Sequence, residues 1–282
     1  MFKRIIVSIV LLGLFFPSLA QNLPTISKPR LYIEEFTHSG GYSRDCEALR
    51  ATVISAINST DRFDMLNTDS QEVAMGSGNN YILKGHLLTY TVNSKVVDGK
   101  TLYSCGFKYT ITIVDASKLT DIYSHTYAYG EASDSLFGGL GSYSSEQDLI
   151  NAVSNKVKKE MIKMVIEQLP LKGEIIGEDI EVKGDKLKSC YINIGCGLGV
   201  KVGDLFSILI PQVRAGRTVY KPVGKLKVKE IFDDDPSLSY CTVTSGEKEV
   251  YEALEEYLEA VSFNEDAKPL MVRSTISFME KF

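Results

Sequence analysis

Residues 195–210 read GCGLGVKVGDLFSILI, and this stretch decides between two kinds of fold. A glycine-rich loop that binds phosphate lies between a strand and a helix, and the first N–H groups of that helix face the anion. Here the segment from Asp204 to Ile210 is another strand pattern, and no Gly-Lys-Ser/Thr motif occurs in the run. The sequence therefore predicts a hairpin turn between two strands of a small barrel, without a nucleotide site.

The residues around this stretch repeat the same short pattern, in which apolar side chains occupy every second position. Such strands, separated by glycines and charged turns, are typical of a small barrel. We predict a second domain over 171–276, followed by a tail at 277–282. Its expected strands are 189–194, 206–210, 225–229, 240–244 and 270–276, with an acidic helix at 247–259.

The chain before this domain has a different organisation, in which helical patterns alternate with strands. A strand at 30–36 precedes a helix that carries Cys46, Leu49, Val53 and Ile57 at helical spacing. An extended segment is expected at 62–66. The remaining expected strands are 81–92, 107–113 and 121–129, and the last two form a hairpin around the turn at 115–118.

A second helix completes this domain. Its apolar residues recur from Leu149 to Val165, and Pro170 stops it. Ser144, with Gln147 three residues later, forms a capping-box signature for its start. We predict an α+β domain over 21–170, an antiparallel sheet covered on one face by two helices.

The first twenty residues have the three parts of a secretory signal. Two basic residues precede an apolar run from Ile5 to Phe16, and the segment ends with Pro17-Ser18-Leu19-Ala20. The run is short for a membrane-spanning helix, and the small residues at its end are typical of a cleavage site. We expect residues 1–20 to be removed and the protein to be exported to the periplasm or to the periplasmic face of the outer membrane. A retained transmembrane anchor is the alternative.

The charge balance disfavours some classes of partner. The leader holds two of the 31 basic residues, so the remaining chain has 29 against 36 acidic residues and a net formal charge of about −7. A nucleic-acid partner is disfavoured, because its phosphates must be neutralised by Lys and Arg. We expect no nucleic-acid binding. Hydrophobic residues make up 44% of the chain, which is ordinary for a globular protein with a sizeable core.

Five cysteines follow the leader: Cys46, Cys105, Cys190, Cys196 and Cys241. In an oxidising compartment an odd number leaves at least one thiol unpaired, and the wide spacing is unlike that of a disulfide-dense scaffold. Cys190 with Cys241 is the pair to test first for a disulfide. The alternative is that most of the cysteines are small buried apolar side chains.

The sequence contains no motif with the spacing of a known catalytic or metal site. His38, His86 and His125 lie far apart, without zinc-ligand spacing or a serine-nucleophile motif. The consecutive acids Asp233–Asp235 point in different directions, so a solvated turn ending at Pro236 is expected there in place of a calcium loop. We expect no catalytic residues, no cofactor and no metal, and therefore no enzyme activity.

Residues 133–145 combine glycine and serine with isolated large apolar side chains. We name Leu136, Phe137, Leu140 and Tyr143 as candidate partner contacts, because such side chains on a flexible surface segment can insert into a partner or pack between protomers. A crossover before the second helix, without a binding role, is an equally good interpretation.

Three segments of the first domain resemble the CsgG-like domain of the curli secretion-channel family: Ser59–Leu66, Asn80–His86 and Thr112–Thr120. They follow the family's Arg-Phe, D-Y-x-L-x-G and x-V-D-x-x-T-G patterns, with Asn80 where Asp is usual and no Gly after Lys118. This fold is also similar to the amino-terminal domain of TolB and to outer-membrane activators of penicillin-binding proteins.

The second domain resembles the carboxy-terminal domain of the flagellar assembly protein FlgT, an SH3-like barrel. Tyr191–Gly195, Gly199–Phe206 and Val223–Leu226 carry this more specific similarity. Together the two resemblances cover nearly all of the chain after the leader, and neither family is enzymatic.

The resemblances imply a protein of envelope assembly, in families that often form rings of protomers. We expect a non-enzymatic component of a periplasmic or outer-membrane complex, like that of curli secretion or the flagellar T ring. Its partners would be envelope proteins, with peripheral association to the outer membrane or peptidoglycan, and self-association is left open. The chain shows neither the acylated cysteine nor the paired membrane hairpins of the curli channel, so a pore does not follow. The alternative is a monomeric binding module that regulates a cell-wall enzyme.

Overall fold

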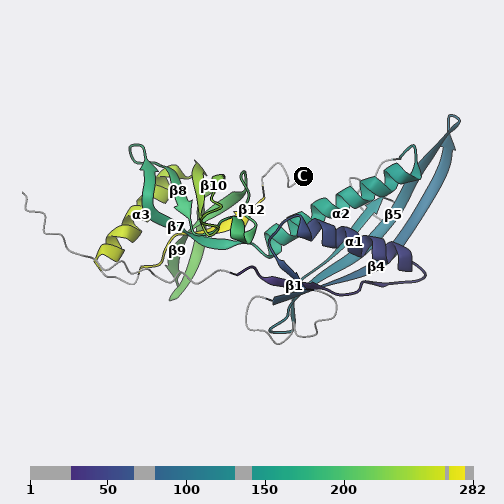
Figure 1. Cartoon of the computed structure of the whole chain (residues 1–282), viewed down its shortest axis with the longest axis horizontal. Helices are drawn as coiled ribbons and strands as arrows, with labels where there is room; N and C mark the ends of the chain where they lie inside the picture. Colours follow the sequence, from purple (N-terminus) through teal and green to yellow (C-terminus); the bar gives the residue numbers. More distant parts are fainter. Residues whose placement is uncertain (1–26, 67–79, 131–141, 264–266, 277–282) are drawn as a thin grey trace, which may run out of the picture.

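The computed structural model of the chain describes residues 27–66, 80–130, 142–263 and 267–276. The chain builds two units, each with its own hydrophobic core. The first is a mixed sheet with two helices, and the second is a closed barrel with one helix (Figure 1). The predicted α+β class is confirmed.

The first sheet has the strand order β3-β1-β4-β5-β6, and β2 (Thr37–His38) also pairs with β4. Strand β1 (Arg30–Ile33) runs parallel to both β3 (Asp64–Leu66) and β4 (Asn80–Val97). The expected purely antiparallel sheet is therefore wrong in this detail. The reason is a crossover: helix α1 (Ser43–Asn58) returns the chain to the same end of the sheet between β1 and β3, which makes the two strands parallel.

A long hairpin dominates the rest of this sheet. Strands β4 and β5 (Lys100–Asp115) pair antiparallel from Tyr81 to Val97, with one register shift between Leu87 and Thr89, and the turn between them is Asp98-Gly99. Both turn residues have positive φ, 50° and 72°, as a two-residue hairpin turn with the right twist requires. The sequence predicted shorter, separate strands at 81–92 and 107–113.

Strand β6 (Thr120–Gly130) pairs with β5 in the predicted hairpin, but its last partner pair is Gly130 with Gly106. Beyond that pair the β4–β5 hairpin continues without β6, and Figure 1 shows it projecting past the ends of the helices.

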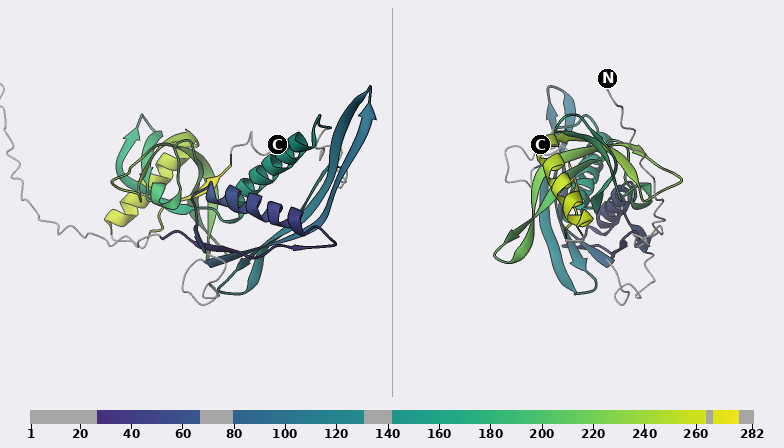
Figure 2. Two further views of the ribbon diagram at one scale, coloured as in Figure 1. Left: turned by 45° about the vertical axis from the view of Figure 1, so that its right-hand side comes forward. Right: turned by 90° about the vertical axis from the view of Figure 1, so that its left-hand side faces the viewer.

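Helices α1 and α2 (Glu146–Gln168) lie side by side on one face of the sheet (Figure 2). The predicted apolar stripe of α2, from Leu149 to Val165, is buried. Its predicted capping residue is wrong by one position: Ser145 is the N-cap, and its Oγ accepts a hydrogen bond of 3.1 Å from the backbone N–H of Asp148.

The second unit is a closed barrel with the strand order β10-β11-β8-β7-β12-β9. Strand β12 pairs with both β7 and β9 and so closes the barrel, as predicted for residues 270–276. Helix α3 (Glu247–Ser262) buries Val250 and Leu254 against the barrel core. Its strands are β7 (Lys172–Val182), β8 (Leu187–Ile192), β9 (Leu205–Arg214), β10 (Arg217–Ile231), β11 (Ser239–Ser245) and β12 (Met271–Thr275).

None of the helices in the described part of the chain is long and apolar enough to span a membrane.

Candidate functional site: the domain joint and the projecting hairpins

The glycine run leads from β8 into β9, so the predicted strand after it is confirmed. The predicted hairpin is wrong, because β8 pairs with β7 and β11 whereas β9 pairs with β10 and β12. It contains one short 3-10 helix at Cys196–Leu198, which ends at Gly199 with φ +78°. No helix follows Gly203; the next element is β9.

Gly199 is the point at which this turn touches the first unit. A Cβ atom at Gly199 would lie 2.3 Å from the backbone oxygen of Asp61, which follows helix α1. That distance is far below van der Waals contact, and the positive φ also disfavours any other residue. Glycine is therefore required here because two backbones from different domains approach closely.

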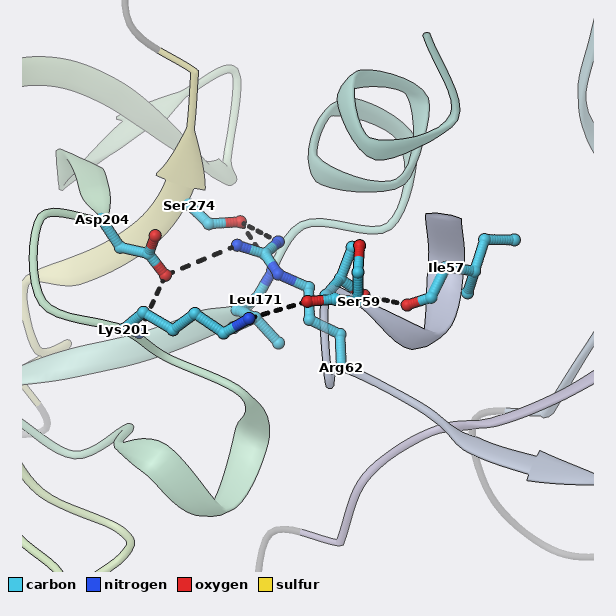
Figure 3. A network of polar contacts seen from close by, with 8 residues as sticks. Ile57, Ser59, Arg62, Leu171, Lys201, Asp204 and Ser274 are labelled. Atoms are coloured by element: carbon cyan, nitrogen blue, oxygen red, sulfur yellow. Dashed lines mark hydrogen bonds and ion pairs between the residues drawn. The ribbon is translucent and has the colours of Figure 1, made fainter. Parts of the chain in front are cut away.

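Arg62 forms the centre of the same contact, and its side chain is only 5% exposed. One terminal nitrogen donates a hydrogen bond of 3.2 Å to the Ser274 hydroxyl on β12, and the other lies 4.0 Å from a carboxylate oxygen of Asp204 (Figure 3). Ser274 also accepts a hydrogen bond of 3.0 Å from the backbone N–H of Leu171. Arg62 of the first unit thus contacts both the barrel's last strand and the residue that precedes β9.

A second cation, supplied by the barrel, contacts the first unit. The Lys201 ammonium donates a hydrogen bond of 2.7 Å to the backbone oxygen of Ser59, which caps the end of α1 (Figure 3). Asp204 accepts a hydrogen bond of 3.1 Å from the Lys201 backbone N–H, so the same carboxylate orients the turn and faces Arg62. We call Ser59, Arg62, Gly199, Lys201, Asp204 and Ser274 the domain joint.

Burial and a neighbouring charge have opposite effects on the pKa of Arg62. Burial lowers the pKa of Arg62, and the nearby Asp204 carboxylate opposes that effect. The guanidinium remains charged, because the ordinary pKa of arginine is far above neutrality. The buried guanidinium donates one hydrogen bond to a hydroxyl and has a carboxylate oxygen 4.0 Å away, so removing either barrel partner would leave more of its desolvation cost uncompensated. Sequence reasoning placed Arg62 at the start of a strand and did not find this role.

Two hairpins project from this joined body. At the end of the β4–β5 hairpin, Val96 is 72% exposed and Val97 is 39% exposed. In the barrel, β9 pairs with β12 only as far as Leu209, so the hairpin formed by the ends of β9 and β10 extends beyond the barrel wall. Val213 near its tip is 77% exposed. Exposed valines at hairpin tips are candidate contact points for a partner.

One of the four predicted contact residues has a defined place. Tyr143 is half-buried and pairs with Tyr103 on the β4–β5 hairpin through two backbone hydrogen bonds of 2.8 and 2.9 Å. Leu136, Phe137 and Leu140 lie outside the described residues. Tyr143 therefore anchors the end of the segment to the projecting hairpin.

All of the cysteines except Cys196 are buried. Cys190 and Cys241 are direct partners across β8 and β11, and both side chains are fully buried in the barrel. Burial raises the pKa of Cys190 to about 12 and raises that of Cys241 as well. The predicted disulfide between them remains a prediction, and their register brings the two residues opposite each other.

The other candidate groups occupy structural positions. Asp235 accepts hydrogen bonds from the backbone and hydroxyl of Ser237, in an exposed turn that matches the prediction for 233–236. His86 lies between the hydroxyls of Thr37 and Ser39, at 2.6 and 2.9 Å. Among the described residues, no group of three His, Cys, Asp or Glu side chains is placed to hold a metal ion.

The largest pKa shifts in the first unit belong to tyrosines in its core. Tyr109 and Tyr127 stack with ring centroids 5.1 Å apart, and the Tyr127 hydroxyl lies 3.0 Å from that of Tyr123. Burial raises the pKa of Tyr109, Tyr127 and Tyr129, because the charged phenolate is disfavoured there. These phenols pack between the sheet and α2 and keep their protons at neutral pH.

An open groove of about 510 Å³ lies between the exposed sides of α1 and α2. Its lining is polar and made of small side chains, and Lys158 is its one charged member. The lining residues are Ala51, Thr52, Ser55, Asn151, Ser154, Asn155 and Lys158.

Comparison with known proteins gave structural likenesses only. No protein-family model matches the sequence, and no curated protein is significantly similar to it. The PelC dodecamer from Paraburkholderia phytofirmans is 13% identical, over 49% of this chain and 90% of that chain, with a TM-score of 0.35. A minor lipoprotein from Acinetobacter baumannii is 15% identical, over 49% of this chain and 91% of that chain, with a TM-score of 0.26.

TolB from Acinetobacter baumannii aligns over a larger part of the chain. It is 11% identical over 72% of this chain and 58% of that chain, with a TM-score of 0.28. Proteins of the bacterial envelope are thus among the similar structures. No family assignment follows from these figures, and the CsgG-like and FlgT-like assignments remain predictions.

Proposed function

We propose that this chain is an exported, non-enzymatic protein of the cell envelope that works as a rigid scaffold in a periplasmic or outer-membrane complex. The observation that carries the proposal is the domain joint. A buried arginine and a glycine-requiring backbone contact fix the barrel to the first unit, so the two projecting hairpins keep fixed directions. A protein that positions partners needs such a geometry, because a preorganised surface loses less entropy on binding.

The distribution of unusual side chains supports a binding role. The groups with the largest pKa shifts are phenols and thiols inside the two cores, where burial is the leading cause. Several exposed apolar side chains, in contrast, lie on the two projecting hairpins, where a partner can reach them: Val96, Val97, Val213, Val219 and Tyr220. The signal-like leader adds export, and the acidic charge of the chain favours protein partners over nucleic acid.

Site-specific photocrosslinking in cells tests this proposal. A photoreactive residue is placed at Val96 or Val213 on the hairpins, at the candidate contact Phe137, and at Lys159 on the exposed side of α2 as the control. We expect the hairpin positions to capture envelope proteins and Lys159 to capture none. Crosslinks confined to Lys159, or a chain that fractionates with the cytoplasm, would contradict the proposal.

The same experiment separates the second candidate function. A monomeric module that regulates a cell-wall enzyme would recover one such enzyme from every reactive position. An assembly component would recover structural envelope proteins or further copies of this chain. Fractionation of envelope extracts, with identification of each captured protein by mass spectrometry, distinguishes the two results.

A further inference from the structure

Two surfaces of the barrel domain carry opposite charge. The projecting part of the β9–β10 hairpin carries Arg214, Arg217 and Lys221, and Arg214 faces Arg217 across the turn. The barrel part of β10 adds three lysines and one acid. Helix α3 has six glutamates and one lysine. Both surfaces belong to the same domain, yet neither neutralises the other within one molecule. Among the described residues, no ion pair joins a basic side chain of β10 or Arg214 to an acid.

The acidic residues of α3 find few partners in their own chain. Lys188 pairs with Glu247 at 2.9 Å, at the first turn of the helix. Lys248 on the helix itself lies 3.8 Å from Glu252. The glutamates of the later turns, among them Glu256 and Glu259, are exposed and have no cation partner within the described part of the chain. The negative surface thus strengthens towards the end of the helix.

Each charged surface also exposes apolar side chains. On the hairpin these are Val213, Val219 and Tyr220, which are 77%, 39% and 43% exposed. Next to the acidic end of α3, Leu258, Val261 and Phe263 are 37%, 45% and 70% exposed. The two surfaces are therefore complementary in charge and alike in apolar character, which is the composition of a specific protein contact.

From this complementarity we propose that the β9–β10 hairpin of one molecule docks on helix α3 of a second copy of this chain. The inference rests on the proposed scaffold function and names a partner for it. The two surfaces differ, so the contact is head-to-tail, and each molecule keeps one free hairpin and one free helix. Such a contact produces a closed ring or an open filament.

The hairpin tip lies far from helix α3 of the same chain, which favours a contact between two molecules over one within a molecule. The hairpin segments 210–214 and 217–222 pair only with each other, so they extend away from the barrel wall below the β9 label in Figure 1. Helix α3 instead approaches β10 near Gly224, where a Cβ atom would lie 2.8 Å from Val250. The hairpin tip at Arg217 is seven residues farther along a strand, or roughly 23 Å.

Charge reversal tests the proposal with a pattern that only this contact predicts. One variant carries Arg217→Glu and Lys221→Glu on the hairpin, and the other carries Glu256→Lys and Glu259→Lys on the helix. Sedimentation velocity of the chain from residue 21, over a concentration series at low and high salt, measures self-association. We expect wild-type association to weaken as salt rises, and each variant alone to associate at least about tenfold more weakly.

Mixing the two variants is the decisive step. The acidic hairpin of the first variant then meets the basic helix of the second, and the native pair of surfaces also remains, so association returns. A control variant with Lys95→Glu and Lys100→Glu on the other hairpin should associate as the wild type does. Unchanged association of the single variants, or no recovery on mixing, would overturn the proposal.

The outcome also separates this inference from the proposed function. A wild-type chain that stays monomeric at all concentrations, yet is crosslinked to other envelope proteins through its hairpins, refutes self-docking and leaves the scaffold function standing. Loss of both self-association and envelope crosslinks refutes both.

Discussion

Replacing Arg62 by alanine should weaken the docking of the two domains. The substitution removes the hydrogen bond to Ser274, a charged donor to a neutral acceptor, which contributes about 1.5–3 kcal/mol. The pair with Asp204 adds about 0–1 kcal/mol, because the atoms are 4.0 Å apart and the Asp204 side chain is 30% exposed. We expect a loss of about 1.5–4 kcal/mol in the free energy that couples the domains.

The native cysteines provide a separate probe for each domain. Cys46 and Cys105 are buried in the first core, and Cys190 and Cys241 are buried in the barrel. Under reducing conditions, pulses of an alkylating reagent at increasing urea concentration label each thiol only when its own domain opens. Mass spectrometry of the peptides then gives one unfolding curve for each domain.

In the wild type the coupling should hold the two curves close together, and Arg62→Ala should separate them. Arg62→Lys keeps the positive charge but loses the planar fork that serves two partners, so it should lose about 1–2 kcal/mol. Arg44→Ala, which removes an exposed arginine from α1, is the matched control and should change stability by less than about 0.5 kcal/mol. Curves for Arg62→Ala that coincide with those for Arg44→Ala would refute the reasoning.

Three further changes follow from the same structure. Gly199→Ala should lower the free energy of unfolding by about 2–4 kcal/mol, because φ is positive there and the added methyl group clashes with the first unit. Gly216→Ala, at a similar φ but in open space, should lower it by about 1 kcal/mol, and urea unfolding of both variants measures the difference. Hydrogen bonds from Ser117 and Lys118 lower the pKa of Asp115 from 3.8 to about 2. The contribution of Asp115 to stability is therefore complete above pH 3.8 and is lost as the pH falls towards 2, and an NMR titration of its carboxyl group with a midpoint near 3.8 would contradict this. In protein purified from the periplasm, Cys190 and Cys241 should be recovered as one disulfide-linked pair of peptides, and alkylation of both thiols after unfolding without reductant would exclude the bond.

Helical and strand patterns with a buried face were readable from the sequence. Cys46, Leu49, Val53 and Ile57 recur at helical spacing, and all four are buried in α1. The alternation in residues 206–210 likewise marked the strand that ruled out a phosphate loop. In each case one face is apolar, so the period of the pattern reports the element directly.

The outer half of the β4–β5 hairpin was not predicted, although its turn was visible. Asp98-Gly99 is a strong hairpin signal, but the strands beside it have exposed side chains on both faces. Without a buried face no alternation appears, and the strands were predicted to stop at Val92 and to resume at Phe107. The direction of β1 was missed for a related reason, since an apolar pattern gives burial and not strand direction.

The domain joint could not be found by any local pattern. Arg62 and Ser274 are 212 residues apart, and each is unremarkable in its own segment. The requirement for glycine at position 199 depends on a backbone oxygen of the other domain. Contacts of this kind follow from how two finished domains dock, so they become visible only in three dimensions.

The most direct test of the rigid scaffold is a distance measurement between the two domains. Spin labels are placed at Lys159→Cys on α2 and Lys229→Cys on β10, both exposed, in a Cys196→Ser background; the four other cysteines are buried. Pulsed electron paramagnetic resonance should give one narrow distance distribution, which broadens when Arg62→Ala is added. A broad distribution with the joint intact, unchanged by that substitution, would show that the domains move independently and would contradict the account.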